Sequence, residues 1–249
     1  MNAIDNSAWV ETYEEVRHKT VSTIDFNAYF EQGEIEGKSL TVIDMGVCDF
    51  PTGSVVASDP FEFFIDEERR PYIQKVPVGR YRAELCVVKS DGVDPDRYAA
   101  VRLRFTRERA VEFRMALTGE EDLSLLDDGG YFGFGVDAAM GAVYDKKVYD
   151  AYCKWYNGWN ESHKGGDIYE ACFKALFKEN YRKHPEYQCA YGDWLNFQVP
   201  GTDYHMPIFS TGFGDGVYPV YWGVDKNGDV CQMVVHLIDI EAVYAAEDE

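Results

Sequence analysis

The chain has 249 residues, 46% of them hydrophobic and 15% aromatic, which is enough apolar material for one packed domain and argues against disorder. With 44 acidic residues against 24 Lys and Arg, the formal net charge is −20, which is expected to exclude nucleic-acid and membrane-surface binding because both need Lys and Arg. The same charge favours solubility and speeds encounter with a basic protein partner.

We expect one domain over residues 1–249 that opens with an N-terminal helical segment, residues 1–35. Residues 8–19 are predicted to form a short helix with its apolar side chains on one side: Trp9, Tyr13 and Val16. Ser22 or Thr23 is expected to cap a second short helix that runs through Phe30 and is ended by Gly33.

A β-rich body is predicted over residues 38–145. The apolar runs indicate strands at residues 40–47, 54–57, 81–88 and 101–105. Turn residues separate them, at Pro51-Thr52-Gly53, Asp59-Pro60 and Asp91-Gly92. Residues 129–135 are rich in Gly and aromatic residues and indicate a turn or a tight β segment.

Residues 101–105 alternate apolar side chains with Arg102 and Arg104. This pattern predicts a half-buried strand with a basic outer face. In so acidic a protein, the two Arg side chains are expected to neutralise nearby carboxylates. A ligand-binding role for Arg102, as an anion site, is the alternative.

A helical excursion is predicted over residues 147–184. Its first helix has an apolar, mostly aromatic face at helical spacing: Val148, Ala151, Tyr152, Trp155, Tyr156 and Trp159. We interpret this face as core. The second helix is predicted to begin near Asp167 with Glu170 as its capping-box partner, and Pro185 ends it.

The C-terminal region, residues 194–241, is predicted to be a β-hairpin. Two apolar runs, residues 217–224 and 230–240, flank Asp225-Lys226-Asn227-Gly228-Asp229, and Asn-Gly supplies the positive φ that a tight turn needs. Both runs are apolar at odd and even positions, so these strands are expected to be covered on both faces and central in the sheet.

Strands, then helices, then a hairpin argue against a regular parallel βαβ arrangement. We therefore predict an α+β fold with a mainly antiparallel sheet, sandwich- or barrel-like, and the two amphipathic helices packed on one side.

The spacing of the cysteines and the lack of a secretory or membrane-spanning pattern predict a cytoplasmic protein. No two of the six cysteines lie within four residues of each other, which excludes CxxC redox and zinc-knuckle patterns. Residues 1–10 lack the pattern of a secretory signal, and no window approaches ~18 uninterrupted apolar residues. The thiols are expected to be reduced and mostly buried.

Four short motifs occur in order over roughly residues 25–240. They are Phe30-x-x-Gly33 ahead of residues 51–60, Pro77-Val78-Gly79-Arg80-Tyr81, residues 135–141 followed by Asp145, and residues 210–219, which include Gly214-Asp215-Gly216. In joint order and spacing they resemble the bacterial family known as domain of unknown function 4241. The chain departs from the family pattern at Ala139, where the family has Gly. The family carries no established activity, so the resemblance implies no mechanism.

Aspartates beside Gly or Pro, near predicted strand ends, are the candidate ligand-binding residues: Asp59, Asp137, Asp145 and Asp215, with Gly214 and Gly216 allowing close approach of a ligand. Asp59, Asp137 and Asp215 are the candidate metal ligands, for Mg²⁺ or Ca²⁺. Asp137 and Asp215 are the candidate catalytic residues, as general bases beside a metal-bound water. The alternative is local turn formation, since Asp side chains bond to nearby backbone.

Two functions remain open from the sequence. The first is an acidic partner-binding protein, antitoxin- or immunity-like or regulatory, whose charge recognises a basic protein. The second is a metal-dependent hydrolase or small-ligand-binding enzyme that uses the loop aspartates. The scattered histidines show no metal-ligand spacing, and His236, in an apolar strand, is interpreted as a satisfied structural residue.

Overall fold

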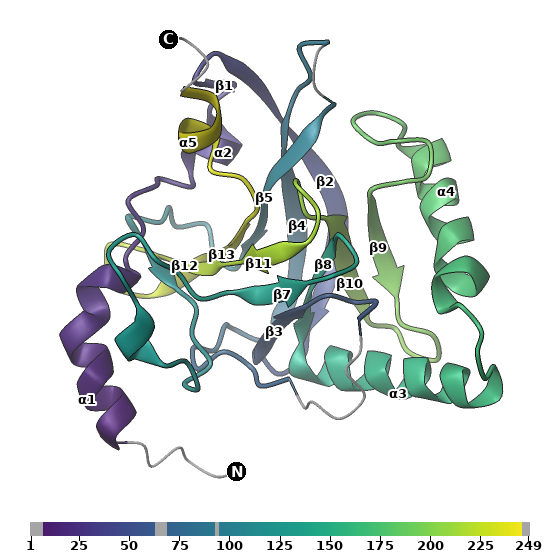
Figure 1. The fold of residues 1–249 in the computed structure, drawn as a ribbon, viewed down its shortest axis with the longest axis horizontal. Helices are drawn as coiled ribbons and strands as arrows, with labels where there is room; N and C mark the ends of the chain where they lie inside the picture. Colours follow the sequence, from purple (N-terminus) through teal and green to yellow (C-terminus); the bar gives the residue numbers. More distant parts are fainter. Residues whose placement is uncertain (1–6, 63–68, 93–94, 246–249) are drawn as a thin grey trace.

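The computed structural model describes residues 7–62, 69–92 and 95–245. Residues 1–6 of the expected N-terminal helical segment lie outside this range. The fold is α+β, with antiparallel sheets that curl into a half-barrel (Figure 1). Within the described residues, no helix has the length and apolar character needed to span a membrane.

The largest sheet has seven strands in the spatial order β1, β2, β4, β5, β13, β12, β6, and every neighbouring pair is antiparallel. Their bounds in that order are Glu34–Ile35, Lys38–Phe50, Gly79–Val88, Arg97–Arg104, Val230–His236, Val220–Val224 and Glu112–Met115. The predicted hairpin is confirmed as β12 and β13, and β13 is central, between β5 and β12.

A second sheet has four antiparallel strands in the order β3, β8, β10, β9, with bounds Val55–Ser58, Met140–Asp145, His205–Ser210 and Trp194–Gln198. A small ribbon pairs β11, Gly216–Tyr218, with β7, Phe134–Val136. The run beginning at residue 217 is therefore divided, because Pro219 separates β11 from β12.

The strands of the second sheet have apolar side chains on both faces because each face meets a different layer. In β3, Val55 and Ala57 join the main core with the seven-stranded sheet, while Val56 joins a second core under the helices. In β8, Val143 and Tyr144 divide in the same way. The period of two along a strand therefore builds two cores from one sheet.

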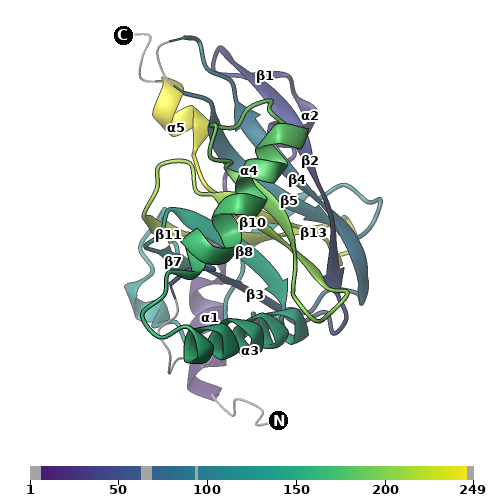
Figure 2. The same ribbon diagram turned by 90° about the vertical axis from the view of Figure 1, so that its right-hand side faces the viewer.

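Two helices cover the outer face of the second sheet, as predicted (Figure 2). These are α3, Lys146–Ser162, and α4, Lys174–Lys183, which a π-helical turn, Tyr169–Phe173, precedes. Tyr152 and Phe173 are fully buried in this second core, so the aromatic face is core. The capping box is half correct: Asp167 accepts from the backbone N–H of Glu170, but the Glu170 side chain pairs with Lys174.

The N-terminal segment contains α1, Ser7–Val16, a 3-10 turn, Arg17–Thr20, and a four-residue helix α2, Ala28–Glu31. The predicted cap at Ser22 or Thr23 is wrong, since the N-cap of α2 is Asn27. Ser22 pairs with a strand instead, since its N–H donates to the Phe113 carbonyl beside the bridge between Val21 and Arg114 of β6, and bends and turns connect it to α2. A last helix, α5, spans Ile240–Tyr244.

Candidate functional site

Asp59 is a buried carboxylate that holds together two turns. Its Oδ1 accepts from the backbone N–H groups of Phe61 at 2.8 Å and Glu62 at 3.3 Å. Its Oδ2 accepts from those of Asp137 at 2.9 Å and Ala138 at 2.7 Å. Four backbone donors, two of them distant in sequence, thus surround one carboxylate.

Asp215 binds the same turn, residues 137–139, that Asp59 binds. The Asp215 Oδ1 accepts from the Ala139 N–H at 3.0 Å, so three successive N–H groups, at residues 137–139, are bound by two carboxylates. Ala139 has φ 54°, a left-handed conformation that glycine adopts more easily. Ala139 therefore has a backbone conformation typical of glycine, with a side chain added.

Gly214 and Gly216 lie on the loop that carries Asp215. Gly214 has φ 96°, and its carbonyl accepts from the hydroxyls of Thr211 and Tyr218 at 2.6 Å and 2.7 Å. The loop is therefore tied down by its own side chains as well as by Asp215.

Asp145 is fully buried and caps the N-terminus of α3. Its Oδ1 accepts from the Lys147 N–H at 2.9 Å, and its Oδ2 accepts from the Thr52 N–H at 2.8 Å. The Thr52 hydroxyl also donates to this carboxylate. Asp145 thereby joins the Pro51-Thr52-Gly53 turn to the helix, which is a structural role.

The structure brings Asp59 and Asp215 to one turn and places the exposed Asp137 on that turn, while Asp145 serves a separate junction. Among the described residues there is no group of three or more His, Cys, Asp or Glu side chains arranged to hold a metal ion. The proposed Mg²⁺ or Ca²⁺ site and the catalytic roles of Asp137 and Asp215 stay predictions.

Arg102 departs from its predicted place on an outer face. It is buried, its Nε donates to Glu84 Oε2 at 2.8 Å, and its guanidinium lies 4.2 Å from the centre of the Phe30 ring. The expected neutralisation of a carboxylate is therefore confirmed for Arg102, but α2 covers this side of β5, so the strand is buried on both faces. Burial lowers the pKa of the Arg102 guanidinium, and Glu84 opposes that effect.

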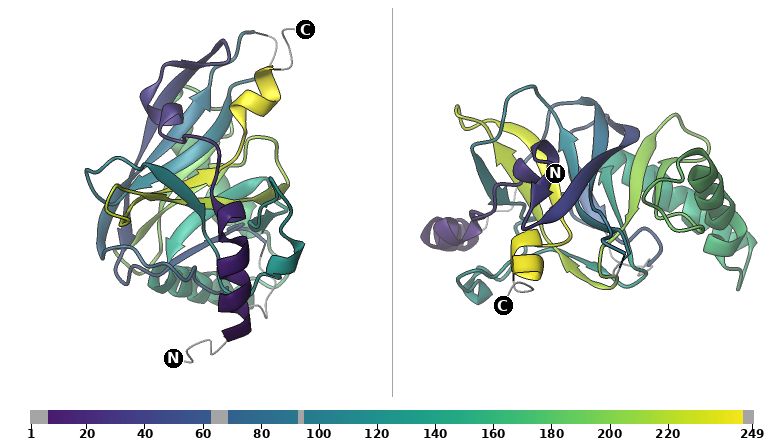
Figure 3. Two further views of the ribbon diagram at one scale, coloured as in Figure 1. Left: turned by 90° about the vertical axis from the view of Figure 1, so that its left-hand side faces the viewer. Right: turned by 90° about the horizontal axis from the view of Figure 1, so that it is seen from above.

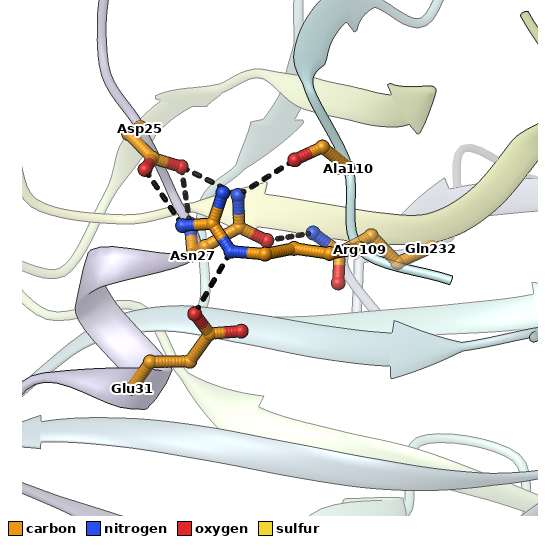
Figure 4. Close-up of polar contacts among 6 residues, drawn as sticks. All are labelled: Asp25, Asn27, Glu31, Arg109, Ala110 and Gln232. Atoms are coloured by element: carbon orange, nitrogen blue, oxygen red, sulfur yellow. Dashed lines mark hydrogen bonds and ion pairs between the residues drawn. The ribbon is translucent and has the colours of Figure 1, made fainter. Parts of the chain in front are cut away.

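A polar network under α2 has no signal in the sequence patterns. Arg109 donates to Asp25 Oδ2 at 3.0 Å and to Glu31 Oε2 at 3.1 Å, at the two ends of α2 (Figure 4). Beneath them, the buried Asn27 amide donates to the Ala110 carbonyl and accepts from Gln232 (Figure 4). These partners are far apart in sequence, so only the tertiary fold brings them together.

The six cysteines are free thiols. Three are buried, at Cys48, Cys86 and Cys231, and Cys189 is exposed. Burial raises the pKa of the Cys86 thiol to about 12 and that of Cys153 to about 11, which disfavours the nucleophilic thiolate at neutral pH.

Exposed carboxylates gather where α1 lies beside the 3-10 turn Leu123–Leu125, at the end of the molecule opposite α3 and α4 (Figure 3). The Trp9 indole donates to the Glu121 carbonyl at 3.1 Å and Lys19 donates to the Leu126 carbonyl at 3.2 Å, so the two segments are joined. We call this region the acidic face; its exposed carboxylates are Glu11, Glu14, Glu15, Glu120, Asp122, Asp127 and Asp128.

Charge is distributed unevenly between the two ends. Residues 7–20 and 118–131 together hold eight carboxylates and two Lys or Arg side chains, a net charge of −6. Residues 146–184, which contain α3 and α4, hold five carboxylates and eight Lys or Arg side chains, a net charge of +3. The protein's negative charge is therefore not distributed evenly over its surface.

Residues 48–235 match the family described as "Protein of unknown function (DUF4241)". The chain belongs to this family. The matched range holds most of both sheets, α3, α4 and the carboxylates of residues 118–131, whereas α1 precedes it. No curated protein and no solved structure matches the chain.

Proposed function

We propose that the protein is an antitoxin- or immunity-like, or regulatory, binding protein whose acidic face recognises a basic protein. The observation that carries the proposal is the concentration of exposed carboxylates on two adjoining segments, in contrast to the net positive charge of the helical end. Negative surface charge that served solubility alone would not need to be distributed unevenly. Complementary charge steers association and rejects partners of the wrong sign.

Apolar side chains interleave with these carboxylates. Leu125 is 70% exposed, Val10 53% and Tyr131 51%, all on α1 or on residues 118–131. Charged rims around apolar or aromatic anchors are the usual anatomy of protein interfaces, because the anchors supply affinity and the rim supplies orientation. The acidic face has both parts.

The proposal is tested by two variants of equal net charge. Glu11→Gln/Glu14→Gln/Glu15→Gln/Asp127→Asn neutralises four of the seven exposed carboxylates of the acidic face and leaves Asp122, whose side chain caps the 3-10 turn. Glu34→Gln/Glu108→Gln/Glu161→Gln/Glu186→Gln neutralises four exposed carboxylates elsewhere. Basic proteins captured from the source cell are identified, purified and titrated against all three proteins by calorimetry at two salt concentrations.

We expect the acidic-face variant to lose tenfold or more in affinity, about 1.4 kcal/mol, and to show a weaker salt dependence, with the control variant close to the original protein. Equal weakening in both variants would mean that net charge alone is recognised. Size-exclusion chromatography of the protein by itself checks a different occupant, since association of the acidic face with the basic helical end of a second copy would replace the proposal.

A further inference from the structure

A cavity of about 560 Å³ opens beside the acidic face. Its walls come from the 3-10 turn after α1, residues 128–131, the start of β12 and the end of β13 with the residues before α5. Its lining includes charged, aromatic and imidazole side chains: Lys19, Asp128, Tyr131, Tyr221, His236 and Asp239. The volume is in the range of pockets that enclose a ligand or a large side chain.

Two acceptors in this cavity wall lack full partners among the described residues. The Asp239 Oδ1 accepts from the Ala242 N–H at 2.9 Å as the N-cap of α5, which leaves Oδ2 without a hydrogen-bond or ion-pair partner. The Nε2 of His236 is buried and also has none. A buried acceptor without a donor is unfavourable, so the His236 Nε2 favours a ligand that carries N–H groups. The Asp239 Oδ2 is not buried, so it is open to the same ligand.

His236 is suited to accept rather than donate at Nε2. Burial lowers the pKa of His236, so the ring is neutral at neutral pH, although Asp239 and a backbone hydrogen bond to Ile238 oppose the effect. Because that bond raises the pKa, the imidazole is its donor, which leaves Nε2 as the lone-pair nitrogen. A neutral ring also does not repel a cation.

Aromatic rings stand beside these acceptors. Tyr131 and Tyr221 line the same cavity as Asp239, and the centre of the Tyr221 ring lies 6.4 Å from that of His236. Burial raises the pKa of Tyr221 to about 12, and the charges of Tyr131 and Asp239 add to this effect. Rings beside a carboxylate attract a cation through their faces. The cation already in the wall, Lys19, is held by Asp128 at 3.3 Å and by the Leu126 carbonyl, so its charge does not compensate Asp239.

We propose that this cavity receives a Lys or Arg side chain of the basic partner, with Asp239 and His236 as its acceptors and Tyr131 and Tyr221 as its aromatic walls. This assignment rests on the proposed function and names the anchor through which the partner is recognised. The position of the cavity against the acidic face, with Asp128 common to both, is the second reason for choosing a partner side chain as the occupant.

The test uses small probes and the full chain. Nα-acetyl-arginine N-methylamide and its lysine counterpart are titrated while the imidazole signals of His236 are followed by NMR, and the matching citrulline compound serves as an uncharged control of nearly the same shape. We expect saturable shifts of the His236 signals with a cationic probe and at least tenfold weaker binding of citrulline. Equal binding of citrulline, or no saturable shift with either cation, overturns the assignment.

Two variants locate the site. Asp239→Asn removes the charge but keeps a good N-cap residue, so α5 is retained, and Tyr131→Ala removes an exposed ring. Each is expected to weaken the cationic probe fivefold or more and to weaken the partner as well. A partner that binds Asp239→Asn and Tyr131→Ala with unchanged affinity overturns the cavity assignment and leaves the acidic face as the recognition site. Probe binding with no partner that depends on the acidic face overturns the partner side chain as occupant and indicates a small cationic ligand.

Discussion

Two groups of carboxylates in this protein have similar chemistry and opposite surroundings. Asp59 and Asp145 are buried and accept from backbone N–H groups. The carboxylates of the acidic face are exposed and, apart from Asp122, which caps the 3-10 turn, have at most a few long-chain cations as partners. The first group holds turns and a helix end in place. The second group is available to a partner, because little in the fold depends on it.

If buried carboxylates hold the fold together and exposed ones do not, Asp59→Ala is expected to cause the largest loss of stability. Asp59→Ala leaves four backbone donors without their acceptor, so we expect a loss of about 3 kcal/mol in the free energy of unfolding. Urea denaturation measures it. Asp137→Ala, at an exposed carboxylate of the same turn, is the control and is expected to change stability by less than about 0.5 kcal/mol. A loss under 1 kcal/mol for Asp59→Ala would mean that its hydrogen bonds are replaced by water.

Asp145→Ala is expected to have the next largest effect. It removes the cap of α3 and the acceptor for Thr52, which together contribute about 2 kcal/mol. Chemical denaturation followed by circular dichroism at helical wavelengths reports it. Asp150→Ala alters an exposed pair with Lys146 on the same helix and should cost no more than about 0.5 kcal/mol. Similar losses for both variants would contradict the assigned capping role.

Ala139→Gly tests whether the left-handed backbone conformation of Ala139 costs stability. A left-handed alanine costs roughly 1–2 kcal/mol and the extra chain entropy of glycine offsets part of that, so we expect a net gain of about 0.5 kcal/mol and a small rise in Tm. Ala138→Gly, next to it but without positive φ, should lower Tm instead. The prediction fails if both substitutions shift Tm in the same direction.

Replacing His236 is expected to have the smallest effect, a change in how the free energy of unfolding depends on pH. Its folded pKa is lowered by burial, so the unfolded chain takes up the proton first as the pH falls below 6.5, and stability is lost until the folded pKa is passed. Denaturation between about pH 7.5 and about pH 5 should show a shallower acid-side decline in His236→Phe than in the original protein. The exposed His163→Gln should keep the original slope. Parallel curves for all three proteins would show that His236 does not titrate differently on unfolding.

Local patterns in the sequence determined the α+β class, the hairpin over residues 225–229, the two helices of the 147–184 excursion and the family resemblance. Each depends on residues close in the chain: a repeat of two or 3.6, a capping aspartate at 167, or a glycine in a turn. Such local patterns predict structure because residues that are close in the chain remain close together in any compact fold. The uneven charge of residues 118–131 and 146–184 is likewise legible in the sequence.

Tertiary structure alone decided where long-range partners lie. Arg102 alternates like a surface residue and is buried, because α2 covers that side of β5. Ser22, one of the two residues predicted to cap a helix, instead donates its backbone N–H to the Phe113 carbonyl of β6. Asp59 looks like a turn residue and also binds a turn 78 positions away, and His236 lines a cavity assembled from several separate segments. Burial and the partners of a polar group depend on which distant elements pack against it, and no local pattern carries that information.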